Sequence, residues 1–331
     1  MPPRLSAGEY IDGVCKGDRM VLSRAITLVE STLASDVALA AEVLAGCQPF
    51  AGRGFRLGIT GVPGVGKSTF IDEFGMHLTR NGHTLAVLAI DPSSGVSHGS
   101  ILGDKTRMDR LSRDPKAFIR PSPARGSLGG VARATREAML LCEAAGHDFI
   151  IVETVGVGQS EVAVHGMVDF FLLLMLAGAG DELQGIKKGI MEMADGIVIN
   201  KADGDNLLPA RRARAEFESA LHLFPMPESG WQPRVKTCSA LNGEGMDEVA
   251  SMVSEYNAFA TATGYLASKR MRQAKQWMHE TIGYLLLDSF RADENVRSAM
   301  VGVEKEVEEG KIPPTVAAAR LIALYLSAHR K

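Results

Sequence analysis

The sequence lacks an excess of charge of either sign. Its 36 lysines and arginines against 39 aspartates and glutamates give a formal net charge of −3. A protein that binds nucleic acid or an anionic membrane over a broad surface ordinarily carries a basic surplus. We therefore expect neither nucleic acid nor a membrane among the partners of this chain.

Cysteine and long apolar runs are also scarce. Cys15, Cys47, Cys142 and Cys238 form no CxxC pair and no metal-ligand spacing, which suits reduced thiols in a core. The most apolar run, residues 170–177, is far shorter than the ~20 residues that cross a bilayer and predicts a buried strand. The N-terminus has no apolar segment typical of a signal peptide. We therefore expect a cytoplasmic protein.

The pattern of apolar residues divides the chain into three regions. Residues 1–50 show helical spacing, which proline and glycine interrupt near the boundary. Residues 51–262 alternate short apolar strands with helices, which predicts an α/β domain with a mainly parallel sheet. Residues 263–331 return to amphipathic helical segments. Their apolar stripes indicate either dimerisation or packing back on the same chain.

A glycine-rich motif between Gly61 and Ser68 predicts a phosphate-binding loop. A strand-like stretch precedes it, and Phe70 and Phe74 follow at helical spacing. Glycines let backbone amides turn toward a phosphate, and the following helix directs its positive N-terminal end to the same point. Lys67 would neutralise the charge of the β- and γ-phosphates, and the Ser68 hydroxyl would contact Mg²⁺. The remaining members of this loop are Val62, Pro63, Gly64, Val65 and Gly66.

Two predicted strands end on acidic residues. Asp91 follows residues 84–90 and would orient the attacking water or hold a metal-bound water, with an ordinary turn acid as the alternative. Glu153 follows residues 149–152, where an acid holds Mg²⁺ directly or through water. Because glutamate is longer than the usual aspartate, we expect contact through water. Gly156 leaves its amide free to approach a γ-phosphate.

The polar, glycine-rich stretch at residues 95–107 has the composition of an active-site loop. Asp104 could reach Mg²⁺ from it. Arg107 could stabilise the charge on the transferring phosphoryl group as an arginine finger supplied in cis. The alternative for both is a solvated helix start with surface ion pairs.

Two later motifs predict recognition of guanine. Asn200, Lys201 and Asp203 form an NKxD element after an apolar strand. The Asp203 carboxylate would accept hydrogen bonds from the ring N–H and 2-amino group of guanine, which adenine does not offer. The second motif comprises Ser239, Ala240 and Leu241. Its main-chain amide would support the guanine oxygen, so the motifs together indicate a GTPase with GTP, GDP and Mg²⁺ as ligands.

A connection rich in glycine and charge at residues 178–189 follows the most apolar strand. Glycines lower the cost of alternative backbone states. Asp181, Gln184 and Lys187 offer polar contacts that one state could form and another could lose. We therefore expect a coupling segment here, with a solvated loop as the alternative.

The stretches GVPGVGKST, AIDPSS, SILGDKTRM, RPSPARGSLGG, ETVGVGQSE and NKADGDN occur in this order. Together they resemble the MeaB family, GTPase chaperones of adenosylcobalamin-dependent methylmalonyl-CoA mutase. The resemblance spans nearly the whole chain. It implies a P-loop GTPase core, a helical N-terminal region and a C-terminal arm that forms a homodimer. It also implies that the protein protects the mutase and gates its cobalamin loading through GTP binding and hydrolysis.

The resemblance assigns roles to individual positions. Gly61 to Thr69 match the family's phosphate loop, whereas Asp203 and Ser239 to Leu241 match its base pocket. The residues that match its magnesium environment are Ser68, Asp104 and Glu153. The resemblance also implies that residues 178–189 are a third switch, beyond the two loops that contact the γ-phosphate.

Two other functions fit parts of the sequence. A P-loop also permits phosphoryl transfer, and relatives have been described as amino-acid transport kinases, but no acceptor-binding or catalytic-base motif of such an enzyme is present. Related GTPases serve as nickel chaperones and use clustered cysteine and histidine ligands. The scattered cysteines and histidines of this chain argue against that function.

Overall fold

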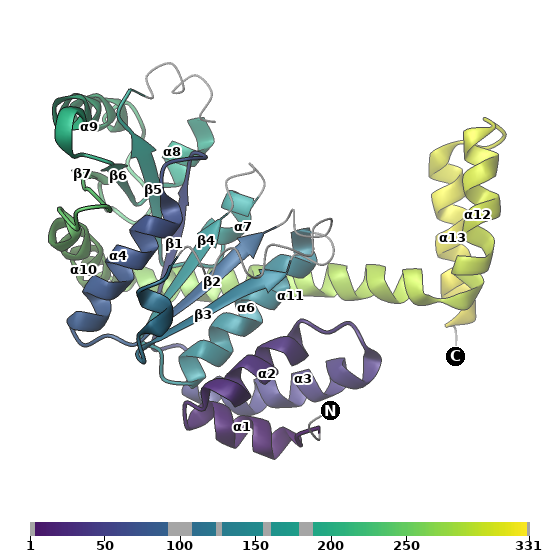
Figure 1. Ribbon diagram of the computed structural model, residues 1–331. Coiled ribbons are helices and arrows are strands. Elements are labelled where there is room, and N and C mark those ends of the chain that lie inside the picture. The colour runs from purple at the N-terminus through teal and green to yellow at the C-terminus, as the bar shows by residue number, and fades with distance from the viewer. Residues whose placement is uncertain (1–3, 92–107, 124–127, 155–159, 179–187, 330–331) are drawn as a thin grey trace. The chain divides into compact units, whose positions relative to one another are not determined.

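The computed structural model describes residues 4–91, 108–123, 128–154, 160–178 and 188–329 (Figure 1). By its internal contacts the chain forms two compact units, Met1–Gln273 and Ala274–Lys331. The larger unit contains the sheet and the helices that cover it. Among the described residues, no helix combines the length and the apolar character that spanning a membrane requires.

A seven-stranded sheet forms the centre of the larger unit, with the strand order β3-β2-β4-β1-β5-β6-β7. Every pairing between the described strands of this sheet is parallel, which confirms the predicted α/β class. The strands are β1 (Phe55–Gly61), β2 (Leu85–Asp91), β3 (Ala117–Pro123), β4 (Phe149–Thr154), β5 (Phe170–Leu176), β6 (Gly196–Asn200) and β7 (Arg234–Thr237). Parallel strands end at one edge of the sheet, and ligands of open α/β sheets bind there. That edge carries the predicted motifs.

Helices cover both faces of the sheet because alternate strand residues point to opposite sides. On β5, Leu172 and Leu174 pack with one helical layer, whereas Phe171 and Leu173 pack with the other. The first layer contains α4 (Lys67–Arg80), the short helix η2 (Leu111–Arg113) and α10 (Met246–Ala262). The second contains α6 (Leu128–Ala144), α7 (Ser160–His165), α8 (Lys188–Met193) and α9 (Leu207–Leu221). This two-sided burial explains the continuous apolar run of β5.

The edge strand β3 differs from the expectation. The proline and glycine content of residues 121–130 is typical of a break between elements, but Pro121 and Pro123 lie inside β3 and pair with Ala89 and Asp91 of β2. Proline has no N–H to donate, and it is accepted in a strand whose outer edge needs no partner. Because β3 is at the end of the strand order, the prolines do not interrupt the sheet.

The predicted helical N-terminal region consists of α1 (Ala7–Cys15), α2 (Arg19–Val29) and α3 (Ala34–Cys47), followed by the short helix η1 (Gln48–Phe50). Their apolar faces share a core with α6, in which Val14, Ile26 and Val43 are fully buried. Ser6 caps α1 reciprocally with Glu9, and Asp18 caps α2. This layer therefore covers the outer side of α6, away from the sheet.

The C-terminal region is helical, as predicted, and comprises α11 (Tyr265–Ala292), α12 (Glu294–Glu308) and α13 (Pro314–Ala328). In the smaller unit, α12 and α13 pack around Val303, Ala317 and Leu321. Asp293 caps α12 by accepting a hydrogen bond of 3.0 Å from the amide of Val296. Many large apolar side chains of this unit remain exposed: Met278, Ile282, Leu285, Leu286, Leu287, Val301, Val316, Ile322 and Leu326.

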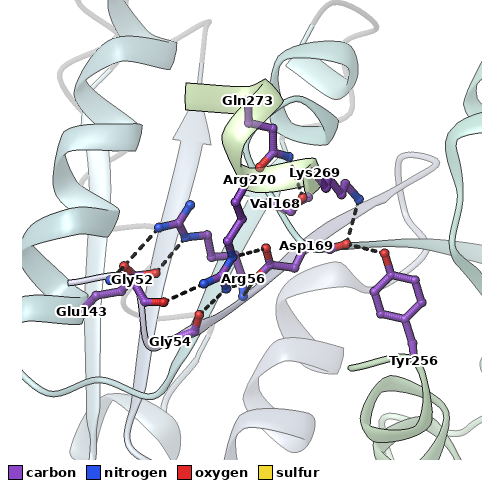
Figure 2. A network of polar contacts seen from close by, with 10 residues as sticks. All are labelled: Gly52, Gly54, Arg56, Glu143, Val168, Asp169, Tyr256, Lys269, Arg270 and Gln273. Carbon is purple, nitrogen blue, oxygen red and sulfur yellow. Dashed lines mark hydrogen bonds and ion pairs between the residues drawn. The ribbon is translucent and has the colours of Figure 1, made fainter. Parts of the chain in front are cut away.

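The first turns of α11 belong to the larger unit and are fixed to it by the buried Asp169 (Figure 2). Arg270 donates to both carboxylate oxygens of Asp169, at 2.8 and 2.5 Å, and to the carbonyls of Gly52 and Gly54. Lys269 donates to the Asp169 carbonyl, and Gln273 donates to the carbonyl of Val168.

The same carboxylate accepts from the amide of Arg56 on β1, at 2.8 Å. Asp169 is fully buried, so removing Arg270 would leave an uncompensated charge in the core. The start of α11 is therefore a structural part of the nucleotide domain.

Candidate functional site

The predicted phosphate loop connects the end of β1 to the start of α4. Gly64 and Gly66 have φ angles of +78° and +89°, a region that L-residues other than glycine adopt at a cost. Gly66 directly precedes Lys67, the first residue of α4. The loop therefore directs its backbone and the positive end of a fourteen-residue helix toward the same point, which is an anion-binding arrangement.

Close neighbours also restrict the space at two glycines of this loop. A Cβ at Gly61 would lie 2.5 Å from the carbonyl oxygen of Leu174 on β5. A Cβ at Gly66 would lie 3.2 Å from the side-chain nitrogen of Asn200. The loop thus packs against both later strands that lead to predicted functional segments. Val65 is fully buried and holds the centre of the loop in the core.

Lys67 lies over its own loop. Its Nζ donates to the carbonyl oxygen of Gly61 at 2.9 Å and to that of Val62 at 3.5 Å. Burial lowers the pKa of Lys67 below its ordinary value, and the charges of Glu153 and Glu161 oppose part of this shift. A phosphate group would supply the missing negative charge, so the lysine is well placed to bind one.

Ser68 and Glu153 come together as the predicted magnesium environment requires. The Ser68 hydroxyl donates to Oε1 of Glu153 at 3.3 Å, and Glu153 is buried. Glu153 pairs with Ile59 of β1 in the sheet, two residues before Gly61. A hydroxyl and a carboxylate beside a phosphate site are oxygen donors of the kind that Mg²⁺ prefers. The described residues therefore fit the ion, with Ser68 and Glu153 as the groups that would hold it.

Asn200 joins the phosphate loop to the base-recognition motifs. Its amide nitrogen donates to the Val65 carbonyl at 2.8 Å, and its amide oxygen accepts from the backbone of Ala240 at 3.1 Å. The Cys238 thiol donates to the same oxygen. Because Asn200 is almost fully buried, these contacts fix the NKxD and SAL turns relative to the loop.

Lys201 and Asp203 continue this junction. Lys201 has a φ of +58°, which is uncommon for a residue other than glycine, and its Nζ donates to the Gly64 carbonyl at 2.9 Å. Ser239 donates through its hydroxyl to Oδ2 of Asp203 at 2.5 Å. Ala240 is buried, whereas Leu241 is 80% exposed. The Asp203 carboxylate is thereby oriented by one partner and keeps a second oxygen for a ligand.

Several predicted residues lie outside the part of the chain that the structure describes. They are Asp104, Arg107, Gly156, Asp181, Gln184 and Lys187. Asp91 ends β2, and only its backbone is described. Pro63 and Thr69 lie in the phosphate loop and in the first turn of α4, where both are exposed.

Sequence reasoning missed Glu161, which is buried on α7 and contributes to the electrostatic environment of Lys67. It also assigned Asn200 only a general role in nucleotide binding. The contacts of Asn200 span 135 residues to Val65 and 40 to Ala240. An acid eight residues after Glu153 was the available signal for Glu161, but its spacing alone identifies no partner.

Comparisons with known proteins agree with this geometry. The profile of the family described as "Methylmalonyl Co-A mutase-associated GTPase MeaB" matches residues 22–295. A mouse protein named "Methylmalonic aciduria type A homolog, mitochondrial" is 49% identical over 327 residues, which cover 96% of this chain and 79% of that protein. The Escherichia coli protein named "GTPase ArgK" is 51% identical over 287 residues, 87% of each chain.

A solved structure titled "Crystal structure of LAO/AO transport system kinase" has a TM-score of 0.75 and 40% identity, and the match covers 98% of this chain and 99% of that one. These matches run across the sheet, the phosphate loop and the base-recognition motifs, and relatives carry the name GTPase. The chain binds guanine nucleotide and hydrolyses GTP, and it belongs to the MeaB family of methylmalonyl-CoA mutase-associated GTPases.

Proposed function

We propose that this GTPase is a chaperone of adenosylcobalamin-dependent methylmalonyl-CoA mutase that protects the mutase and gates its cofactor loading. The observation that supports this most directly is the family match, because the description of the family associates it with that mutase. The Asn200 junction between phosphate loop and base motifs supports a nucleotide-controlled role. A cytoplasmic location is part of the proposal.

Within the site, Lys67 would stabilise phosphate charge and Ser68 with Glu153 would hold Mg²⁺, joined by Asp104. Bound there, the ion would neutralise charge between the β- and γ-phosphates. Asp91 would orient the attacking water, and Arg107 would act as the arginine finger. The amide of Gly156 would contact the γ-phosphate.

Coupling to the mutase would act through the segment that contains Asp181, Gln184 and Lys187. This segment follows β5, which pairs with β1 and so with the strand that leads into the phosphate loop. A client can accelerate hydrolysis only if it binds one state of the GTPase more tightly than the other. Polar side chains after β5 could provide that difference.

The coupling role is tested with Lys187→Ala. We expect its basal GTP hydrolysis to stay near that of the wild type, whereas acceleration by saturating mutase is lost. Single-turnover hydrolysis with and without the mutase measures both quantities. Full acceleration in Lys187→Ala, Gln184→Ala and Asp181→Ala alike would contradict a coupling role of this segment.

A kinase that acts on a transport protein is the second candidate, because the LAO/AO structure carries that name and matches nearly the whole chain. The two functions differ in the fate of the γ-phosphate. A chaperone GTPase releases it to water, whereas a kinase transfers it to a protein. Incubation with γ-³²P-labelled GTP or ATP and a transport protein separates them, since labelled protein would favour the kinase.

Homodimerisation through the C-terminal region is a further part of the proposal. The exposed apolar side chains between Met278 and Leu326 provide a surface that a second copy could cover. Truncation after Gln273 removes this surface and keeps the ion pair between Arg270 and Asp169. We expect a monomer that still binds GTP, measured by light scattering and calorimetry.

Truncation after Ala262 is the informative comparison, because it also deletes Arg270. Breaking a buried ion pair by removing one partner costs about 3–5 kcal/mol, so this shorter chain should unfold at a lower denaturant concentration. An unchanged mass after truncation at Gln273 would exclude the C-terminal surface as the dimer interface.

A further inference from the structure

One stripe of α4 runs away from the proposed magnesium site. Ser68, Asp72, Gly75 and Thr79 follow each other at spacings of four, three and four residues, so they lie on one face of the helix. Asp72 is therefore about one helical turn, roughly 6 Å along the axis, from Ser68. A residue that contacts the Asp72 side chain therefore lies close to the first turn of α4.

Residues 108–116 dock along this stripe. The side chain of Leu111 lies against Gly75, where a Cβ would come within 2.6 Å of it. Further along, the Thr79 hydroxyl donates to Asp114 at 2.7 Å, and Lys116 donates to the Thr79 carbonyl at 3.1 Å. The absence of a side chain at Gly75 thus lets the segment approach the helix that begins at the phosphate loop.

Arg110 makes the contacts nearest the phosphate loop. Its Nε donates to Oδ2 of Asp72 at 3.0 Å, and its Nη2 forms a short ion pair with Oε2 of Glu73. The amide of Leu111 donates to the other oxygen of Asp72 at 2.9 Å. One guanidinium therefore neutralises two adjacent carboxylates, whose side chains are each only 11% exposed.

Glu73 extends these contacts to the base-recognition side. A Cβ at Gly243 would lie 3.0 Å from Oε1 of Glu73, so the turn that follows the SAL motif packs against this carboxylate. Without Arg110, Asp72 and Glu73 would repel each other, and Glu73 would press toward that turn. Arg110 thus neutralises negative charge where α4 packs against the turn that follows the SAL motif.

We propose that Arg110 is a positioning residue for GTP hydrolysis, which fixes the chain beside Asp72, one helical turn from Ser68. In the sequence, Arg110 follows Asp104 by six residues and Arg107 by three. The contacts of the Arg110 guanidinium therefore determine where the chain contacts α4 shortly after these two residues. A displacement of about 1 Å in such a position can cost up to ~10² in rate.

Magnesium dependence separates this role from a purely structural one. Asp72 and Glu73 are mostly buried, so loss of Arg110 also lowers stability by leaving their charges without this partner. The two bonds of the guanidinium, one to each carboxylate, also determine where the chain lies. We therefore expect that, well below the unfolding temperature, loss of Arg110 changes hydrolysis and magnesium use while GDP binding stays near that of the wild type.

The test uses the full-length chain and compares Arg110→Ala, Arg110→Lys and Arg113→Ala. Arg113 is an exposed arginine at the end of η2, the short helix that Arg110 directly precedes, and makes no ion pair within the described residues, so it is the matched control. Steady-state GTP hydrolysis is measured across a Mg²⁺ titration, with GDP affinity by calorimetry and unfolding temperature by circular dichroism. In Arg110→Ala, kcat should fall about tenfold and the half-maximal Mg²⁺ concentration should rise several-fold.

Arg110→Lys should recover only part of this loss, because an ammonium cannot bind both carboxylates as a fork does. Arg113→Ala should behave like the wild type. Unchanged kcat and Mg²⁺ midpoint in Arg110→Ala, or a fall of GDP affinity as large as the fall of kcat, would overturn the inference. The inference rests on the proposed magnesium roles of Ser68 and Asp104. Wild-type hydrolysis that needs no Mg²⁺ would refute those roles, whereas magnesium-dependent activity unaffected by Arg110→Ala would refute this inference alone.

Discussion

Asp203→Ala will remove the preference for guanine nucleotides. In the wild type, Ser239 orients the Asp203 carboxylate at 2.5 Å. A site built to pair with particular donors discriminates against a ligand without them by about 10⁴ or more, because its polar groups would stay unpaired. Without the carboxylate that penalty disappears. Calorimetry should show GDP affinity falling by about 10⁴-fold to the level of ADP.

The control for this experiment is Asp205→Ala. Asp205 is an exposed acid in the turn η4 (Gly204–Asn206) directly after the motif, so its removal changes the net charge equally. It should leave the preference intact. Similar affinities for GDP and ADP in the wild type, or an undiminished preference in Asp203→Ala, would contradict base recognition by Asp203.

Lys67→Ala will abolish most of the GTP hydrolysis. The lysine is held over the phosphate loop by the carbonyls of Gly61 and Val62, where developing phosphate charge would be largest. Removing one preorganised electrostatic group costs about 10²–10³ in kcat. Single-turnover hydrolysis at saturating GTP measures this loss separately from weaker binding. Undiminished turnover would refute the phosphate-loop role.

Thermal unfolding provides the internal control for Lys67→Ala. Burial disfavours the charged ammonium in the nucleotide-free protein, whereas the charges of Glu153 and Glu161 and the carbonyls of the loop favour it, so its removal should change the unfolding temperature without nucleotide only slightly. The increase caused by GDP should shrink, because ligand stabilisation follows affinity. A variant that unfolds early even without nucleotide would indicate misfolding instead of lost electrostatics.

The amino-acid pattern alone determined the central strands and the nucleotide motifs. A parallel strand buried on both faces requires an uninterrupted apolar run, as in Phe170–Leu176, and phosphate binding requires glycine at fixed positions of the loop. Both requirements act within a few residues, so they are visible locally. The edge strand β3 escaped prediction because its prolines oppose a central strand but not an edge strand.

Only the tertiary structure decided which distant residues meet. Asn200 bridges Val65 and Ala240, Arg270 closes on Asp169 across 101 residues, and Arg110 joins Asp72 to Glu73. The sequence shows that these side chains are polar, but it does not identify their partners. Their partners depend on strand order and helix packing, which bring together groups separated by tens to hundreds of residues. Periodicity reports how a residue is buried in its own element, whereas its hydrogen-bond partner is chosen when the elements assemble.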